Sequence, residues 1–157
     1  MANSQRPKMK YMEFIRTMPS AVLPHIPDHL SGIQPHQPFR WIIQFNFGER
    51  RLHYEVGRVA YSKDLELAYH FESKDKNLNR YLLTGFRRHL FEIRDTLGPQ
   101  MQAEMWDRGW TKVYERVPAA DISADYQQHI GQRLADIIIC LQPIFADLRK
   151  DVSQVYR

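Results

Sequence analysis

The sequence is poor in the residues from which many enzyme sites are built. Its 157 residues include one cysteine, Cys140, which excludes a disulfide within the chain and a zinc site made of several thiolates. Cys140 lies in an apolar run with helical spacing, so we interpret it as a small buried hydrophobic residue and not as a nucleophile. A single cysteine also fits the reducing conditions of the cytoplasm.

Long apolar runs and glycine-rich motifs are missing as well. The longest strongly apolar run, Ile137–Leu141, is far shorter than the roughly 20 residues that span a membrane, and residues 1–10 lack the apolar core of a signal peptide. The sequence has no phosphate-binding loop, no dinucleotide-binding fingerprint and no nucleophile elbow. We therefore expect a cytoplasmic protein without a cofactor, and we favour a non-enzymatic role over catalysis.

No segment of the chain concentrates charge of one sign. The net charge is +4 and the isoelectric point is about 9.3, but the basic residues are spread along the chain. Domains that bind nucleic acid usually carry a basic block or stripe. The charge therefore gives only mild support for an acidic partner.

Prolines dominate the beginning of the chain. Lys8–Thr17 has the spacing of a short helix, and five prolines follow between Pro19 and Pro38. Prolines at this density exclude a long helix and a central strand, so the sequence predicts a proline-rich arm over residues 19–38, either an extended linker or a loop wrapped on the body. We divide the chain into a short helix with this arm, residues 1–38, and a single domain, residues 39–157.

Alternating apolar residues then predict three strands. The alternation covers Phe39–Phe47, Leu52–Val56 and Leu65–Phe71, and turn residues separate these segments. Strands joined by such short turns form an antiparallel meander. One face of the meander is expected to be buried and the other to be wetter.

Two long helices are predicted from apolar residues three or four positions apart. The first is capped by Ser73 or Asp75 and runs to Leu97, before Gly98, and its Gly85 permits a close approach of a neighbouring backbone. The second is capped by Asp121 or Ser123, and its apolar pattern continues to Val152. Pro143 lies inside it and is expected to bend or break it.

The most informative segment is Trp106-Asp107-Arg108-Gly109-Trp110. It predicts a hairpin with a three-residue loop, because Gly109 can adopt the positive φ that such a loop needs at its last position. In this register Trp106 pairs with Trp110, Glu104 with Lys112, and Gln102 with Tyr114, all on the face away from the helices. The intervening side chains are expected to face the core: Met101, Ala103, Met105, Thr111 and Val113.

The predicted order of elements is therefore α-β-β-β-α-β-β-α. Five antiparallel strands form one sheet with two long helices packed on one face, an α+β architecture. The wetter face collects acids, histidines and aromatic residues: His53, Glu55, Glu66, His70, Glu72, Glu104, Trp106, Trp110, Lys112, Tyr114 and Arg116.

This wetter face allows three functional interpretations, beside the plain one that it is only a solvated surface. Aromatic residues with a few charges suit a protein interface. Trp and Tyr could also stack on the bases of single-stranded nucleic acid, although the carboxylates repel phosphates. Glu55, Glu66 and His70 could form a metal or acid–base site if they converge within a few ångström, which alternation alone does not establish.

Two known groups of proteins share features with the chain. The order of elements over residues 8–153 resembles that of type III secretion chaperones and related small homodimeric proteins, which implies a dimer that binds an extended peptide. Leu65–Tyr69, Phe91–Arg94, Leu97-Gly98, Trp106 and Leu141–Phe145 occur in an order similar to that of an uncharacterised bacterial domain, often found beside restriction-endonuclease-like modules. That likeness implies a role in defence or nucleic-acid-associated systems and transfers no catalytic residues.

The sequence thus predicts an interaction or chaperone-like protein that forms a homodimer and binds protein or peptide. The predicted binding residues are Trp106, Trp110, Lys112, Tyr114 and Arg116, in which the indoles supply buried area and the cations orient an acidic or backbone-rich partner. No catalytic residue and no metal ligand is assigned. The alternative is a nucleic-acid-binding accessory module of a restriction or defence system.

Overall fold

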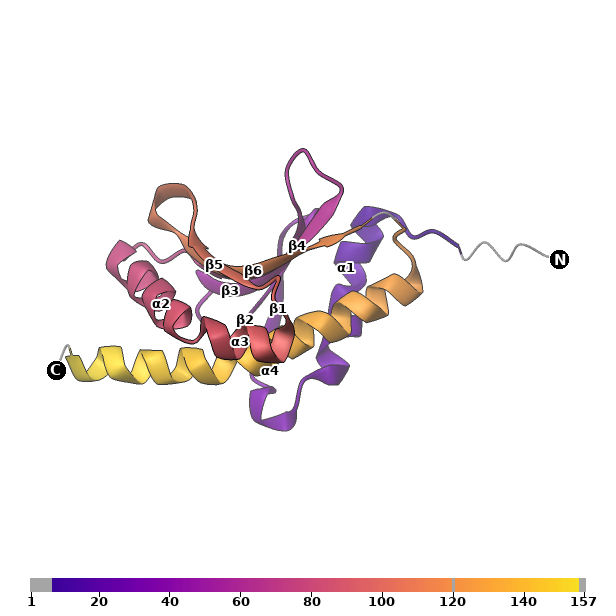
Figure 1. Ribbon diagram of the computed structural model, residues 1–157. Helices are drawn as coiled ribbons and strands as arrows, with labels where there is room; N and C mark the ends of the chain where they lie inside the picture. The colour runs from indigo at the N-terminus through magenta and orange to yellow at the C-terminus, as the bar shows by residue number, and fades with distance from the viewer. Residues whose placement is uncertain (1–6, 120, 156–157) are drawn as a thin grey trace.

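The protein is built from one curved antiparallel sheet with helices on one side (Figure 1). The computed structural model describes residues 7–119 and 121–155. In Figure 1, α2, α3 and α4 lie below the sheet, and the hairpins β3–β4 and β5–β6 rise on the opposite side. In chain order the elements are α1 (Tyr11–Val22), β1 (Gln34–Phe39), β2 (Ile42–Asn46), β3 (Leu52–Arg58), β4 (Asp64–Phe71), α2 (Lys76–Arg88), α3 (Leu90–Leu97), β5 (Gln102–Met105), β6 (Thr111–Pro118) and α4 (Ala124–Val155).

The sheet has six strands in the order β1-β2-β3-β4-β6-β5, and all neighbours are antiparallel. The α+β class is confirmed, whereas the predicted number of five strands is wrong. The additional strand is β1, which contains Pro35 and Pro38. Proline cannot donate to a ladder, but an edge strand tolerates it, because only one side of that strand is paired.

Residues 19–38 do not form an extended linker, one of the two predicted alternatives. Helix α1 continues through Pro19 to Val22, and two short 3-10 helices, Leu23–His25 and Asp28–Leu30, lead into β1. The buried apolar face of α1 outweighs the hydrogen bond that Pro19 cannot make. Strand β1 lies at the opposite edge of the sheet from β5, so this segment does not cover the tryptophan hairpin.

The first predicted strand is also divided. Phe39 ends β1 and pairs with Ile42, the first residue of β2, so the chain reverses at Arg40-Trp41. The alternation predicted one strand whose apolar face includes Phe39 and Trp41, but these two residues lie at the turn and are 54% and 52% exposed. A two-residue turn preserves the alternation of apolar residues, which is why the sequence pattern hid it.

The predicted helix over residues 73–97 is broken into α2 and α3 at His89, whose φ of −96° and ψ of 3° are not helical. The Asp75 side chain accepts hydrogen bonds from backbone amides of the first turn and caps α2. Gly98, with φ of 113°, ends α3 as predicted. Gly85 lies close to a neighbour, but a Cβ there would meet the Leu148 side chain of α4 and not a backbone as expected.

Helix α4 is a single element of 32 residues, and Pro143 does not end it. Pro143 is exposed, so the missing hydrogen bond falls on the solvent side, while Leu141 and Phe145 hold the helix on the core. Helix α1 crosses α4 closely at Gly131, where a Cβ would meet the Ala21 backbone. None of the helices in the described part of the chain is long and apolar enough to span a membrane.

The core lies between the sheet and the helices. On this side β4 contributes Leu65, Leu67, Tyr69 and Phe71, which are 0–1% exposed. Met105 was expected to join them but is 50% exposed, because its short strand β5 forms an edge of the sheet. The helices leave the other face of the sheet uncovered, and this open face carries the candidate site.

Candidate functional site

Strand register brings the polar residues of the open face together across β3, β4 and β6. His53 pairs with His70, and His70 pairs with Lys112. In the next row Ala68 lies between Glu55 and Tyr114. The small Ala68 side chain leaves space into which longer side chains on either side of it can converge.

The tryptophan hairpin has the predicted register. The Trp106 amide donates to the Trp110 carbonyl at 2.9 Å, and the two indole centroids lie 5.3 Å apart. Gly109 has the predicted positive φ, 79°, and Arg108 also has a positive φ of 57°. The Trp106 ring lies 5.2 Å from the His70 ring, so the indoles are on the open face, away from the helices.

Three of the predicted binding residues form polar contacts within the chain. Lys112 Nζ lies 2.7 Å from Glu66, the Tyr114 hydroxyl donates to Glu104 at 2.8 Å, and Arg116 lies 3.0 Å from Asp64. Both Trp106 and Trp110 are half-buried. The role of all five residues in binding a partner stays a prediction.

Beside the hairpin, five side chains form what we call the His–Glu cluster: His53, Glu55, Glu66, His70 and Glu72. The three residues whose convergence the sequence left open do meet: His70 Nε2 lies 2.8 Å from Glu66 Oε1, and His70 Nδ1 lies 3.7 Å from Glu55 Oε2. Glu72 Oε2 lies 3.2 Å from the same Nδ1. His70 is therefore surrounded by three carboxylates.

His53 contributes a buried nitrogen with no hydrogen-bond partner in the described structure. Its Nδ1 lies 2.7 Å from the Arg50 carbonyl, which accepts only from an N–H, so the hydrogen of a neutral His53 ring is assigned to Nδ1. Nε2 then carries a lone pair, and the residue is 2% exposed. This atom lies 3.4 Å from Glu55 Oε1 and 4.0 Å from Glu72 Oε1, so it faces the cluster.

The carboxylates control the protonation of His70. Burial alone would lower the pKa of His70, but Glu55, Glu66 and Glu72 outweigh burial and raise it to about 10. Burial raises the pKa of Glu55, yet His70, His53 and Gln44 lower it to about 2. With no bound cation, His70 is therefore an imidazolium at neutral pH, and its extra proton lies among carboxylates.

With a neutral His53 ring, the cluster carries more negative than positive charge. Three carboxylates face one imidazolium and the ammonium group of Lys112, which pairs with Glu66. If His70 loses its extra proton, the net charge of the cluster becomes more negative by one unit. The cluster can therefore hold either a proton or a metal cation at the same place, and the two compete.

Sequence reasoning placed His53 and Glu72 on the open face but did not include them in a set with Glu55, Glu66 and His70. A signal for them was present: β3 contains His53-Tyr54-Glu55 and β4 contains His70-Phe71-Glu72. Each His-x-Glu segment directs both polar side chains to the same face of its strand. The exact pairing of His53 with His70, which brings the two segments together, came only from the structure.

Comparison with protein-family models, with curated proteins and with solved structures found no match to this chain. The two resemblances drawn from element order and short segments therefore stay predictions.

Proposed function

We propose that this protein binds a divalent transition-metal ion in the His–Glu cluster. The ligands are His53 Nε2, His70 Nδ1 and one carboxylate oxygen each from Glu55 and Glu72. The observation that carries the proposal is the buried, unpaired Nε2 of His53, which faces two carboxylates. A buried polar atom without a partner is costly, and a bound cation would compensate it.

The spacing of the donor atoms fits a four-coordinate ion. At metal–ligand distances of about 2.0–2.2 Å, the ligands of a tetrahedral site lie roughly 3.3–3.6 Å from one another. Here His70 Nδ1 lies 3.2 Å from Glu72 Oε2 and 3.7 Å from Glu55 Oε2, whereas His53 Nε2 lies 3.4 Å from Glu55 Oε1 and 4.0 Å from Glu72 Oε1. His53, His70 and Glu72 each offer a donor atom within 4.8 Å of the other two, and Glu55 would complete the set. Closing the set around one ion requires the Glu55 and Glu72 carboxylates to rotate, because each imidazole faces a different oxygen of each carboxylate.

Both histidines are oriented as metal-binding histidines usually are. The ring nitrogen that points away from the ligand set is bound by an acceptor, which is the Arg50 carbonyl for His53 and Glu66 for His70. Such outer acceptors fix the tautomer and the ring orientation, and they increase the basicity of the ligand nitrogen. Lys112 in turn holds Glu66 at 2.7 Å.

The donor set selects a class of metal. Two imidazole nitrogens and two carboxylate oxygens suit Zn²⁺ and its first-row neighbours, whereas Mg²⁺ and Ca²⁺ prefer oxygen ligands alone. The side chains of Glu55, Glu66 and Glu72 are 13%, 16% and 19% exposed, so the cluster is open enough to solvent for an ion to enter.

The test is a calorimetric titration of Zn²⁺ into protein freed of metal with a chelator. We expect one ion per chain with a Kd at or below ~1 µM. The variant His53→Asn places an amide near Nδ1, which keeps a donor for the Arg50 carbonyl but removes Nε2, and it is expected to bind at least ~100-fold more weakly, a loss of about 2.7 kcal/mol.

The matched control is His89→Asn. His89 lies 3.2 Å from Glu92 in an exposed His–Glu pair at the junction of α2 and α3. This variant is expected to bind Zn²⁺ as the unmodified protein does. Equal weakening in both variants, or no binding by the unmodified chain, rejects the proposal.

A further inference from the structure

A second surface lies at the turn between β1 and β2. Phe39 and Trp41 stack on each other there, with ring centroids 5.2 Å apart and ring planes 6° from parallel, and about half of each residue is exposed. Phe39 pairs with Ile42, and the row continues through Gly57 to Glu66. Three strand spacings, roughly 14 Å, therefore separate Phe39 from Glu66. Glu55 of the His–Glu cluster lies nearer, because a Cβ at Gly57 would come within 4.0 Å of both Glu55 Oε2 and the Trp41 carbonyl.

The turn is held in place by α1 and β3. The Tyr11 hydroxyl donates to the Trp41 carbonyl at 2.7 Å, and the Arg58 guanidinium lies 4.2 Å from the Tyr11 ring centroid. The stacked rings are thus presented by a fixed backbone. An aromatic surface that is already ordered loses little conformational entropy when it binds a ligand.

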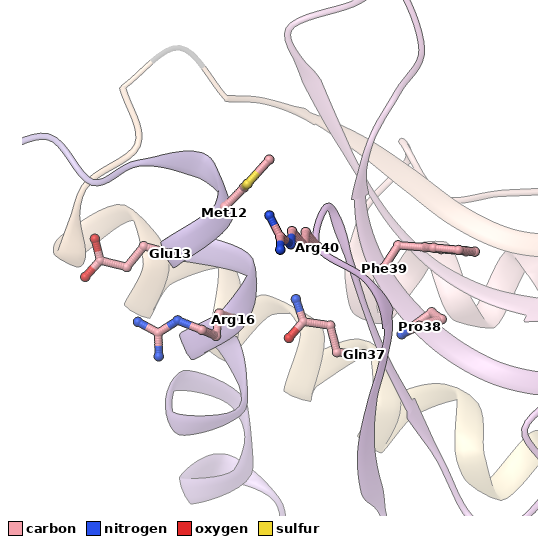
Figure 2. A pocket seen from close by; sticks show the side chains of 7 residues that line it. All are labelled: Met12, Glu13, Arg16, Gln37, Pro38, Phe39 and Arg40. Carbon is pink, nitrogen blue, oxygen red and sulfur yellow. The ribbon is translucent and has the colours of Figure 1, made fainter.

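Arginines surround the stack. Figure 2 shows the Arg40 side chain turned toward α1, across a pocket from Met12 and Arg16, while the Phe39 ring extends away from α1. The pocket has a volume of about 440 Å³, and Glu13 is the one acid among its lining residues. Arg16, Arg40 and Arg58 are exposed, and within the described residues none of them has an ion-pair partner.

We propose that this turn binds single-stranded nucleic acid: a base extends the Phe39–Trp41 stack, and Arg16 and Arg40 contact phosphates. A flat face of two parallel rings suits another planar ring, and such stacking requires no particular base. Guanidinium groups bind phosphate oxygens through paired hydrogen bonds. A strand that crosses the end of the turn can reach the rings on one side and the arginines on the other.

Two other occupants fit less well. A peptide added to the edge of the sheet needs backbone donors from β1, but Pro35 and Pro38 supply none. A symmetric contact with a second copy would place the arginines of one turn against those of the other, which is electrostatically unfavourable. The charge and the planar rings both favour a polyanion with aromatic groups.

The test is fluorescence anisotropy of a labelled oligothymidylate of about 20 nucleotides, measured with a chelator present so that the result does not depend on the metal site. Trp41→Ala is expected to weaken binding about 10-fold, because one stacked base contributes on the order of 1–3 kcal/mol. The double variant Arg16→Gln/Arg40→Gln is expected to weaken binding. It is also expected to make the slope of log binding constant against log salt concentration less steep, by the equivalent of roughly two phosphate contacts.

The matched controls lie on the helices. Phe91 on α3 is 87% exposed, and Arg80 on α2 is exposed. Phe91→Ala and Arg80→Gln therefore test whether any exposed aromatic ring or any exposed arginine contributes to binding. Both are expected to leave the affinity unchanged, with all variants checked for folding by circular dichroism. The proposal is overturned if the oligonucleotide does not bind, if Trp41→Ala binds equally well, or if a poly-glutamate peptide binds the turn with equal affinity.

Discussion

His53 and His70 face each other across β3 and β4, with their ring centroids 5.5 Å apart. His53 Nδ1 is bound by the Arg50 carbonyl, and His70 Nε2 is bound by Glu66. The other nitrogen of each ring, His53 Nε2 and His70 Nδ1, points toward Glu55 and Glu72. This arrangement supports the metal-binding proposal, and four predictions test it or the fold that positions it.

The first prediction concerns Glu66, which we place outside the ligand set. Glu66→Gln keeps an acceptor oxygen near His70 Nε2 but removes the charge, so Zn²⁺ affinity measured by calorimetry should fall by about 10- to 100-fold and not disappear. Glu66, Glu55 and His70 also lie close enough to form a different ligand set. If Glu66→Gln abolishes binding while His53→Asn does not, the ion occupies that set, and our assignment of ligands is wrong.

The second prediction concerns the choice of metal. Because two ligands are imidazole nitrogens, a large excess of Mg²⁺ should not displace Zn²⁺, whereas Co²⁺ should bind and give the intense visible absorption typical of four-coordinate cobalt. Competition titrations followed by that absorption measure both effects. Displacement by Mg²⁺ would indicate an oxygen-only site that excludes the two histidines.

The third prediction concerns the stability of the metal-free protein. The pKa of His70 is raised from 6.5 to about 10 in the folded state, so the stabilisation from its charged form is complete below pH 6.5 and is lost as the pH rises through about 10. The free energy of unfolding should therefore decrease across this interval, by roughly 1–3 kcal/mol.

The control for this pH dependence is His70→Gln, whose side chain does not titrate. Urea unfolding at several pH values should show that the difference in the free energy of unfolding between the unmodified protein and this variant shrinks as the pH approaches 10. A constant difference between the two proteins across the interval would show that His70 is not charged in the fold.

The fourth prediction concerns the crossing of α1 and α4. A Cβ at Gly131 would meet the backbone of Ala21, which cannot move without shifting α1. Gly131→Ala should therefore destabilise the protein by about 1–3 kcal/mol in urea unfolding, even though alanine favours a helix. Gly32→Ala, at a position with nothing near the added Cβ, should cost less than about 1 kcal/mol.

Much of the sheet could be predicted from alternation and turn chemistry. Gly109 fixed the register of the β5–β6 hairpin, and the two indoles lie side by side as that register requires. Alternation failed at Arg40-Trp41, because a two-residue turn keeps the period of two while reversing the chain. Proline content hid β1, since the rule against proline in strands does not hold at a sheet edge.

The site was only partly predictable for a related reason. Alternation indicates which face a side chain occupies, so His53, Glu55, Glu66, His70 and Glu72 could all be placed on the open face. Convergence depends on the register between β3 and β4 and on side-chain rotamers, neither of which alternation determines. The unpaired Nε2 of His53 depends in addition on a hydrogen bond to the Arg50 carbonyl, a contact within a turn.

The most direct test of the central claim is an anomalous difference map from crystals of the protein grown with Zn²⁺ and measured at the zinc absorption edge. We predict one peak on the open face, about 2.0–2.2 Å from both His53 Nε2 and His70 Nδ1. No peak between these two nitrogens, or a zinc ion bound only at another place, would contradict the account.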